Sequence, residues 1–161
     1  MRAITLILLM GIFLSLAVSA EGSLGAEEVI RSIFPSFQEY NVESHILENQ
    51  ELKVFTILSD GQILGWALVL DEMGKIKPIT FLVGVDIQGK VLAVYLLEYR
   101  DMFGAEIKRR SFLRQFQGKV LKDPLAVGRD IDAVTGATIS SHAATTAVKK
   151  SLEVIEKIRK K

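Results

Sequence analysis

The sequence predicts an α+β fold, a single domain in which an antiparallel sheet meander is flanked by helices. Strand-like apolar segments follow one another in the middle of the chain, and amphipathic helical patterns precede and follow them. The chain has 161 residues, of which 49% are hydrophobic, so it can form one domain with its own core. It contains no cysteine, so this core forms without disulfides.

The predicted elements begin with a short helix over residues 27–34, which has acids in its first turn and is ended by Pro35. The predicted strands cover residues 53–58, 62–70, 79–85 and 91–99. Asp60-Gly61 is a strong turn pair between the first two strands, and residues 71–78 are predicted as a polar turn. Trp66 is either a core residue or a side chain that stacks on a ring.

The pattern changes after residue 99. Gly104 predicts a tight turn, and apolar residues at helical spacing follow it as far as Phe116. The basic residues around that face are Lys108, Arg109, Arg110 and Arg114. They form either a solvated surface or a site for an acidic redox partner or a phosphate. Residues 121–128 are predicted as a loop, and residues 140–160 as a final helix.

The first 20 residues have the layout of a targeting segment. Arg2 precedes an apolar run, and Val18-Ser19-Ala20 is a small-residue cleavage site, which is typical of a secretory signal peptide. The alternative is an uncleaved membrane anchor, because residues 3–20 approach the roughly 20 residues that span a bilayer. In either case residues 21–161 form the domain, and we expect it to be periplasmic or otherwise extracytoplasmic.

Composition excludes several classes of function. The formal net charge is only +1, so no nucleic-acid surface is expected. Without cysteine there is no thiolate chemistry and no iron–sulfur cluster. His45 and His142 lie far apart in the sequence, so no metal site is expected. The chain also lacks a G-x-S-x-G turn and a convincing acid–base pair, so no catalytic residues are predicted. An enzyme acting on a small substrate stays an alternative, with Asp101, Glu106 and His142 as its candidate acids and bases.

The segment "DIDAVTGATISS", residues 130–141, groups several hydroxyls directly before the final helical pattern. A Thr or Ser hydroxyl in this place can cap a helix by accepting backbone N–H bonds. The unpaired N–H groups of a helix start also bind anions such as phosphate. Gly136 permits backbone conformations that other residues avoid. From the residues alone, a plain helix cap is the favoured interpretation, and an anion site is the alternative.

Asp132-Ala133-Val134-Thr135-Gly136-Ala137-Thr138 resembles the flavinylation motif of the FMN-binding domain family. The motif is an Asp, two variable residues, Ser or Thr, and then Gly-Ala-Thr. The family includes the G subunit of the Rnf complex, the C subunit of the sodium-translocating NADH:quinone oxidoreductase and the periplasmic domain of the nitrous-oxide-reductase regulator. The resemblance covers roughly residues 54–150, since "GWALVL", "FLVGVDIQGKVLAVYLLEY" and "FLRQFQGKV" are similar to the family's sheet and its Gln-Phe-x-Gly-Lys segment.

This resemblance implies an extracytoplasmic electron carrier, with FMN as its cofactor, and no substrate chemistry of its own. A flavin transferase would join FMN through a phosphoester to Thr138, and Asp132 would serve in recognition by the transferase. The other residues expected at the cofactor are Thr135, Gly136, Ala137, Ser140, Ser141 and Gly104. The implied partner is a redox protein or a membrane electron-transport complex. The alternative is a non-redox binding or regulatory module of the same fold, associated with the membrane.

The chain departs from the Rnf-type pattern in one loop. Rnf-type members have Glu-Thr-Pro-Gly-Leu-Gly after the last strand, near the flavin ring. This chain has "RDMFGAEI" over residues 100–107, which is closer to the shorter loop of the regulator-like members. The ring contacts and the redox potential therefore cannot be carried over from the Rnf-type members, and the different loop argues against membership in a sodium-pumping or Rnf complex.

Overall fold

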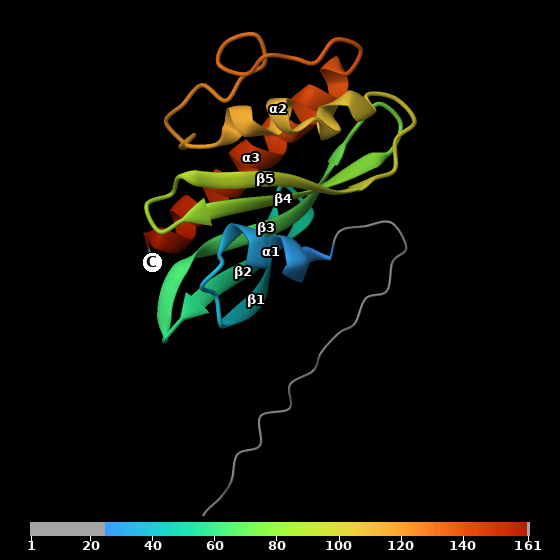
Figure 1. The fold of residues 1–161 in the computed structure, drawn as a ribbon. Coiled ribbons are helices and arrows are strands. Elements are labelled where there is room, and N and C mark those ends of the chain that lie inside the picture. Colours follow the sequence, from blue (N-terminus) through green and yellow to red (C-terminus); the bar gives the residue numbers. More distant parts are fainter. Residues whose placement is uncertain (1–24, 161) are drawn as a thin grey trace, which may run out of the picture.

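The structure, a computed structural model, describes residues 25–160 of the chain (Figure 1). The predicted targeting segment, residues 1–20, lies outside the described residues. The elements in chain order are α1 (Ala26–Ile33), β1 (Glu39–Leu47), β2 (Gln50–Ser59), β3 (Gln62–Met73), β4 (Pro78–Asp86), β5 (Val91–Tyr99), the 3-10 helix η1 (Ala105–Lys108), α2 (Arg110–Leu113), the 3-10 helix η2 (Arg114–Phe116) and α3 (Thr138–Arg159).

The five strands form one antiparallel sheet in the order β1-β2-β3-β4-β5, so each strand pairs with its neighbour in the sequence. This arrangement confirms the predicted meander. Between β2 and β3, Asp60 and Gly61 have φ angles of 50° and 71°. Positive φ at both central residues matches the twist of a tight hairpin, so the predicted turn pair is also confirmed.

Helices cover both faces of the sheet. Figure 1 shows α2 and α3 on one side of the strands and α1 on the other. Alternate residues of β4 enter two separate cores: Phe81 and Val83 pack beneath α3, whereas Leu82 packs against α1. Trp66 lies in the core beneath α3 and is only 6% exposed, so it is a core residue. The helix-flanked α+β fold is therefore confirmed.

The structure differs from the sequence prediction in one strand that was not predicted and in two element boundaries. Strand β1 was not expected, because its side chains are largely exposed and show no apolar face; main-chain pairing with β2 holds it. Residues 71–73 belong to β3 and not to a turn, since they continue the pairing with β4. The last helix begins at Thr138, two residues before the predicted start at Ser140.

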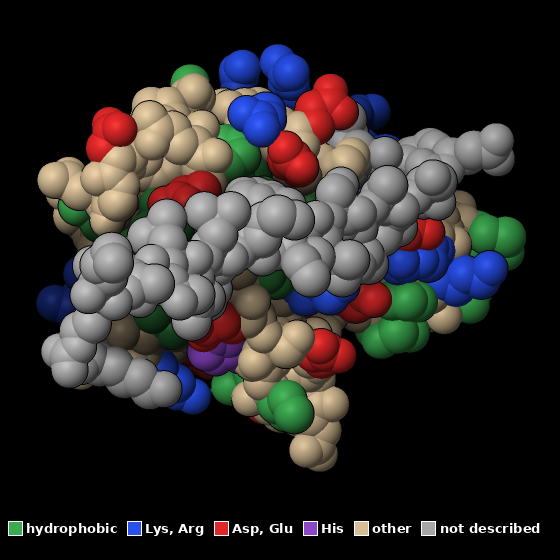
Figure 2. Space-filling view, turned by 90° about the horizontal axis from the view of Figure 1, so that it is seen from below, with side chains coloured by type: hydrophobic (Ala, Val, Ile, Leu, Met, Phe, Trp, Pro, Cys, Tyr) green, Lys and Arg blue, Asp and Glu red, His purple; other side chains and the backbone are tan. Residues whose placement is uncertain are grey.

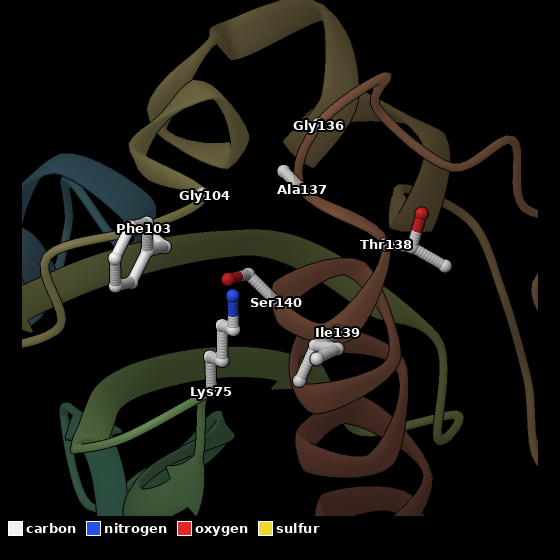
Figure 3. Close-up of a pocket in the computed structure, with 8 residues that line it drawn as sticks. All are labelled: Lys75, Phe103, Gly104, Gly136, Ala137, Thr138, Ile139 and Ser140. Atoms are coloured by element: carbon white, nitrogen blue, oxygen red, sulfur yellow. The ribbon is translucent and has the colours of Figure 1, made fainter.

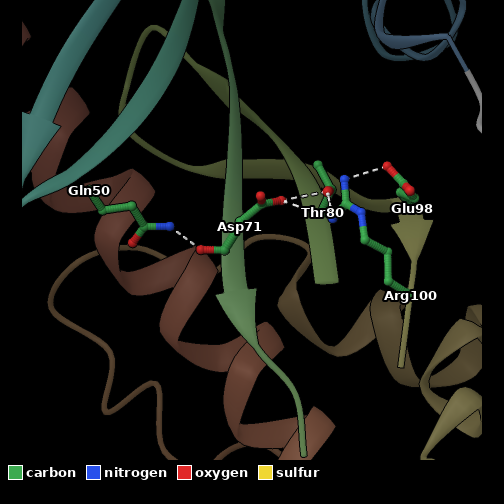
Figure 4. Close-up of polar contacts among 5 residues, drawn as sticks. All are labelled: Gln50, Asp71, Thr80, Glu98 and Arg100. Atoms are coloured by element: carbon green, nitrogen blue, oxygen red, sulfur yellow. Dashed lines mark hydrogen bonds and ion pairs between the residues drawn. The ribbon is translucent and has the colours of Figure 1, made fainter. Parts of the chain in front are cut away.

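Next to the β3–β4 turn, polar side chains of the sheet form hydrogen bonds and ion pairs with residues on neighbouring strands (Figure 4). Arg100 Nη1 donates a hydrogen bond of 2.9 Å to Thr80 Oγ1, and Arg100 also pairs with Glu98. Asp71 accepts a hydrogen bond from Thr80 through its side chain and one from Gln50 through its main-chain oxygen. Polar side chains thus join the strands next to the β3–β4 turn, which is why polar residues are tolerated there.

The surface bears charges of both signs. On the face seen in Figure 2, Lys and Arg side chains are interspersed with Asp and Glu side chains outside the area that grey atoms cover. Within residues 25–160, no helix is long and apolar enough to cross a membrane. The same part of the chain holds no group of three or more His, Asp or Glu side chains arranged to bind a metal ion.

Candidate functional site

A cavity of about 270 Å³ lies at the N-terminal end of α3 (Figure 3). Three segments line it: the β3–β4 turn, the loop that follows β5, and the start of α3. We use "loop side" for Lys75, Phe103 and Gly104, which come from the first two segments. We use "helix side" for residues 136–140, which come from the third.

The helix side begins with a tight turn. The N–H of Ala137 donates to the main-chain oxygen of Val134 at 2.9 Å, and Gly136 has a φ of 80°, which favours glycine. Ala137 is the N-cap of α3, and no described side chain makes a capping hydrogen bond there. The plain-cap interpretation is therefore wrong: the turn places an alanine at the cap and the hydroxyls inside the helix. The first N–H groups of α3 remain available to an anion.

The hydroxyls of this segment have different surroundings. Ser141 is buried; its Oγ accepts the N–H of Val134 at 3.1 Å and donates to the oxygen of Ala137 at 2.9 Å. Thr138 is exposed, and in Figure 3 its side chain points away from Ser140. A helical threonine populates two χ1 rotamers, so this hydroxyl can turn without a backbone change. Ser141 thus holds the turn from inside, while the Thr138 hydroxyl is accessible to a reagent.

Gln115 of η2 holds the first residue of the motif through the main chain. The N–H of Asp132 donates to Gln115 Oε1 at 2.8 Å, and Gln115 Nε2 donates to the oxygen of Asp132 at 3.2 Å. The Asp132 side chain is exposed, as is Thr135. This leaves the Asp132 carboxylate free to meet another protein, and its role in recognition stays a prediction.

The loop side pairs a cation with an aromatic ring. Lys75 Nζ lies 4.4 Å from the centroid of the Phe103 ring, within the range of a cation–π interaction. Lys75 forms no ion pair with any other described residue. The loop side therefore presents an aromatic surface and an uncompensated positive charge to the cavity.

Asp101 joins the two segments of the loop side. Its side chain is buried, and Oδ2 accepts the N–H of Ile76 at 2.9 Å from the β3–β4 turn. Oδ1 accepts the N–H groups of Met102 at 2.7 Å and Phe103 at 3.3 Å. These backbone hydrogen bonds, above all the one from Ile76, lower the pKa of Asp101 below its ordinary value of 3.8. The carboxylate is therefore charged at neutral pH.

Gly104 brings the loop side against the helix side. Its φ is 86°, and a Cβ at this position would lie 2.4 Å from Ser140 Oγ and 3.2 Å from Tyr99 Oη. Tyr99 donates a hydrogen bond to the main-chain oxygen of Phe103, and its Oη lies 3.3 Å from Ser140 Oγ. Burial raises the pKa of Tyr99 above 10.0, so the phenol behind the cavity is neutral at physiological pH.

The structure brings together most of the site residues that the sequence predicted. Those that line the cavity are Gly104, Gly136, Ala137, Thr138 and Ser140, whereas Thr135 and Ser141 do not. The basic residues Lys108, Arg109, Arg110 and Arg114 are exposed and lie outside the lining. Lys75 was not predicted, because nothing in the sequence joins residue 75 to residue 103. The loop over residues 100–107 was compared with the family's loop near the ring, but Asp101 and Phe103 were not singled out in it as cofactor-site residues. An aromatic residue, Phe103, in a polar loop was the one available signal.

Residues 74–153 match the family model of the FMN-binding domain. The chain belongs to the FMN-binding domain family. Its cofactor is FMN, and the matched residues include both sides of the cavity and all of the Asp132–Thr138 motif. The predicted family and cofactor are confirmed.

Several known proteins are similar to this FMN-binding domain. The G subunit of the Na(+)-translocating ferredoxin:NAD(+) oxidoreductase complex of Acetobacterium woodii is 26% identical over 119 residues, which are 68% of this chain and 58% of that protein. The G subunit of the proton-translocating ferredoxin:NAD(+) oxidoreductase complex of Clostridium ljungdahlii is 36% identical over 100 residues, covering 57% of this chain and 54% of the relative. The chain thus spans little more than half the length of these relatives.

The crystal structure of Shewanella oneidensis NqrC has a similar fold. The TM-score is 0.52 at 17% sequence identity, and the similarity covers 80% of this chain and 71% of NqrC. At this level of identity the likeness concerns the fold alone, and it agrees with the helix-flanked antiparallel sheet described above.

The residues around the cavity fit the parts of FMN. The uncapped start of α3 suits the phosphate, because its N–H groups and the helix dipole favour an anion. Phe103 and Ile139 are 47% and 49% exposed and offer apolar surface for the flat ring. Gly136 leaves the space beside the helix start open, since a Cβ there would meet nothing within 4 Å.

Proposed function

We propose that this FMN-binding domain is an electron-transfer protein that acts outside the cytoplasm, with FMN joined through its phosphate to Thr138. The observation that carries the proposal is the exposed Thr138 hydroxyl at the uncapped start of α3, beside a cavity. The last threonine of the Asp132–Thr138 motif is the residue that the family resemblance marks for attachment.

The attachment bond would be an ester between Thr138 Oγ1 and the phosphorus of FMN. As it forms, Thr138 loses its hydroxyl proton and the phosphorus loses one oxygen substituent, which leaves with that proton, so the protein gains the mass of FMN minus one water. The esterified phosphate keeps a negative charge, which the N-terminal end of α3 stabilises by about 0.3–1 kcal/mol at an exposed position. Asp132 is exposed six residues before Thr138 and would be read by the flavin transferase before the bond forms. Covalent attachment would prevent loss of the cofactor outside the cytoplasm, where a dissociated FMN is not readily replaced.

The bound flavin supplies reversible electron transfer, and the protein supplies position and electrostatic surroundings. Among the described residues, the cavity lining includes no carboxylate and no imidazole. The names of the relatives, which are subunits of oxidoreductase complexes, favour an electron carrier over an enzyme with its own substrate.

The partner we propose is a membrane electron-transport complex or one of its redox proteins. Support comes from the relatives, which are named as G subunits of ion-translocating oxidoreductase complexes. The location outside the cytoplasm rests on residues 1–20, whose sequence is that of a signal peptide or a membrane anchor.

Mass spectrometry of the intact protein tests the attachment. After expression with an active flavin transferase, the wild-type protein should be heavier by one FMN minus one water and should stay yellow after denaturation and washing. Thr138→Ala should lose both signals completely, while its free energy of unfolding changes by no more than about 0.5 kcal/mol because Thr138 is exposed. Thr146→Ala, which changes an exposed threonine of α3 outside the motif, should keep the flavin.

Two outcomes would contradict the proposal. A folded wild-type protein of unmodified mass, obtained alongside a transferase that modifies a known acceptor, would favour the non-redox module. Retention of covalent flavin by Thr138→Ala would place the bond on another residue, with Thr135 the first to examine.

A further inference from the structure

We propose that Lys75 sets the redox potential of the bound FMN, and that the cavity beside Phe103 and Ile139 receives its isoalloxazine ring. This inference rests on the proposed attachment at Thr138. Neither Lys75 nor Phe103 belongs to the motif that marks the attachment. The two parts of the site can therefore be tested separately.

The positions of the side chains separate a phosphate end from a ring end. In Figure 3 the Lys75 amino group and the Ser140 hydroxyl point toward one another, with Phe103 beside them, whereas Thr138 points to the opposite side of the helix start. A phosphate attached at Thr138 lies on that opposite side. The remainder of the cofactor must then extend toward Lys75 and Phe103 to enter the cavity.

Exposed apolar surface indicates what occupies the ring end. Phe103 is 47% exposed and Ile139 is 49% exposed, although both line a cavity of about 270 Å³. Large apolar side chains exposed around a concave site are typical of a place where a flat, largely apolar ligand binds. The ring of the resident FMN meets this description and is already held next to the cavity by its attachment.

The charge of Lys75 gives it an effect on the potential. Reduction of the flavin by two electrons and one proton leaves the ring with one negative charge; the electrons come from the reductant and the proton from water. A nearby cation stabilises that charged state more than the neutral oxidised ring. Lys75 is the only basic side chain among the lining residues, and no described carboxylate pairs with it.

Asp101 is the positioning residue for Lys75. It accepts the N–H of Ile76, the next residue after Lys75, and also the N–H of Phe103. On the other side of Lys75, the N–H of Gly74 donates to the oxygen of Lys77 at 3.0 Å, which closes the turn. A Cβ on Gly74 would lie 2.5 Å from Asp101 Oδ2, so the turn packs directly on the carboxylate. Through these contacts Asp101 keeps Lys75 over the Phe103 ring.

Reductive titration of the flavin-loaded protein tests the role of Lys75. Wild type, Lys75→Met, Lys75→Arg and the control Lys77→Met are first checked by mass for complete flavin loading, then titrated with dithionite against reference dyes. Lys75→Met should lower the equilibrium constant for two-electron reduction at least tenfold, which is a fall of about 30 mV. Lys75→Arg keeps the charge and should change the constant less than threefold. Lys77→Met removes a charge from the same turn outside the lining and should change it less than twofold.

The role of Asp101 is tested by a double-mutant cycle. Asp101→Asn removes a negative charge and by that effect alone favours the reduced flavin, so the positioning role is measured by the coupling. Lys75→Met should lower the equilibrium constant less in the Asp101→Asn protein than in the wild type. Thermal unfolding of each variant identifies any that fails to fold. If Asp101→Asn is one of them, Gly74→Ala takes its place in the cycle, because its Cβ would lie 2.5 Å from Asp101 Oδ2 and disturb the same contact while the carboxylate stays. Independent, additive effects would overturn the positioning role.

Three results would overturn the role of Lys75. The first is an unchanged potential in fully loaded Lys75→Met, and the second is an equal shift in Lys77→Met. The third is loss of flavin from a folded Lys75→Met, which would place Lys75 at the phosphate. A wild-type protein without covalent flavin contradicts the proposed function instead, so the two failures are distinguishable.

Discussion

The two sides of the cavity are built in different ways. The helix side is one continuous segment, held by the Gly136 turn and by Ser141, and its sequence can be read as a single motif. The loop side joins residue 75 to residue 103 through the buried carboxylate of Asp101. The proposed attachment would therefore depend on local sequence, whereas the surroundings proposed for the ring would depend on tertiary contacts. The ring surroundings can change in evolution while the attachment motif stays intact.

The largest effect on stability is expected where the two sides meet. Gly104 and Gly136 have nearly equal φ angles, 86° and 80°, but only Gly104 is packed against other atoms. Gly136→Ala should cost about 1–2 kcal/mol, the strain of a left-handed residue. Gly104→Ala adds a collision with Ser140 Oγ and should cost about 2–4 kcal/mol in total.

Urea unfolding of both glycine variants measures this difference. Gly118→Ala is the control for strain alone, since Gly118 has a φ of 82° and open space around it, away from the cavity. Equal losses in all three variants would show that the two sides of the cavity are not in tight contact at Gly104.

A smaller effect is expected from the hydroxyl that holds the turn. Ser141→Ala removes the acceptor of the Val134 N–H and should lower the free energy of unfolding by about 1–3 kcal/mol. Ser151 is a matched control in the same helix: it is equally buried, but its hydroxyl only donates to the oxygen of Ala147. Ser151→Ala should change the stability less, by about 0.5 kcal/mol, because a hydroxyl that donates only to the i−4 oxygen contributes little to a helix and its removal leaves no N–H without an acceptor.

Equilibrium denaturation of the two serine variants checks this prediction. Equal losses of unfolding free energy in the two variants would mean that the Ser141 hydroxyl contributes only to packing in the core and does not hold the turn before α3.

The smallest expected effect is the loss of folding stability at acidic pH. Backbone hydrogen bonds, led by that of Ile76, lower the pKa of Asp101 in the folded protein, so its contribution is present above the ordinary value of 3.8 and is lost as the pH falls through the lower folded value. Wild type should therefore lose stability as the pH falls below about 4, and Asp101→Asn should lose less over the same range. Urea midpoints measured between about pH 6 and pH 3 test this; parallel curves would contradict it.

Most of the fold could be predicted from the sequence, because the patterns that mark its strands and turns lie within short segments. The Asp60-Gly61 pair marks a hairpin, and alternating or continuous apolar runs mark β3, β4 and β5. Strand β1 was not predicted, because an exposed edge strand needs no apolar face. Its stability comes from pairing with β2. Residues 71–73 look like a turn in sequence, but Asp71 has a cross-strand partner in Thr80.

Only the helix side of the cavity could be predicted from the sequence. Gly136, Ala137, Thr138 and Ser140 stand together in the sequence, and they also stand together around the cavity. Lys75 and Phe103 are brought together by Asp101, whose hydrogen bond with Ile76 spans 25 positions. No pattern of residue types predicts such a contact, since many carboxylates of the chain are equally polar and, among the described ones, only this one is buried by the two loops.

The placement of α3 has a consequence for the order of events during biogenesis. The β3–β4 turn and the loop after β5 are synthesised well before residues 136–140, which follow every strand along the chain. Until α3 docks on the sheet, the cavity lacks one of its two sides, and Thr138 has no ring site beside it. Under the proposed function, cofactor loading would be a late step: a transferase acting on the folded domain would meet the Thr138 hydroxyl and the cavity together, whereas a partly folded chain would offer the hydroxyl alone.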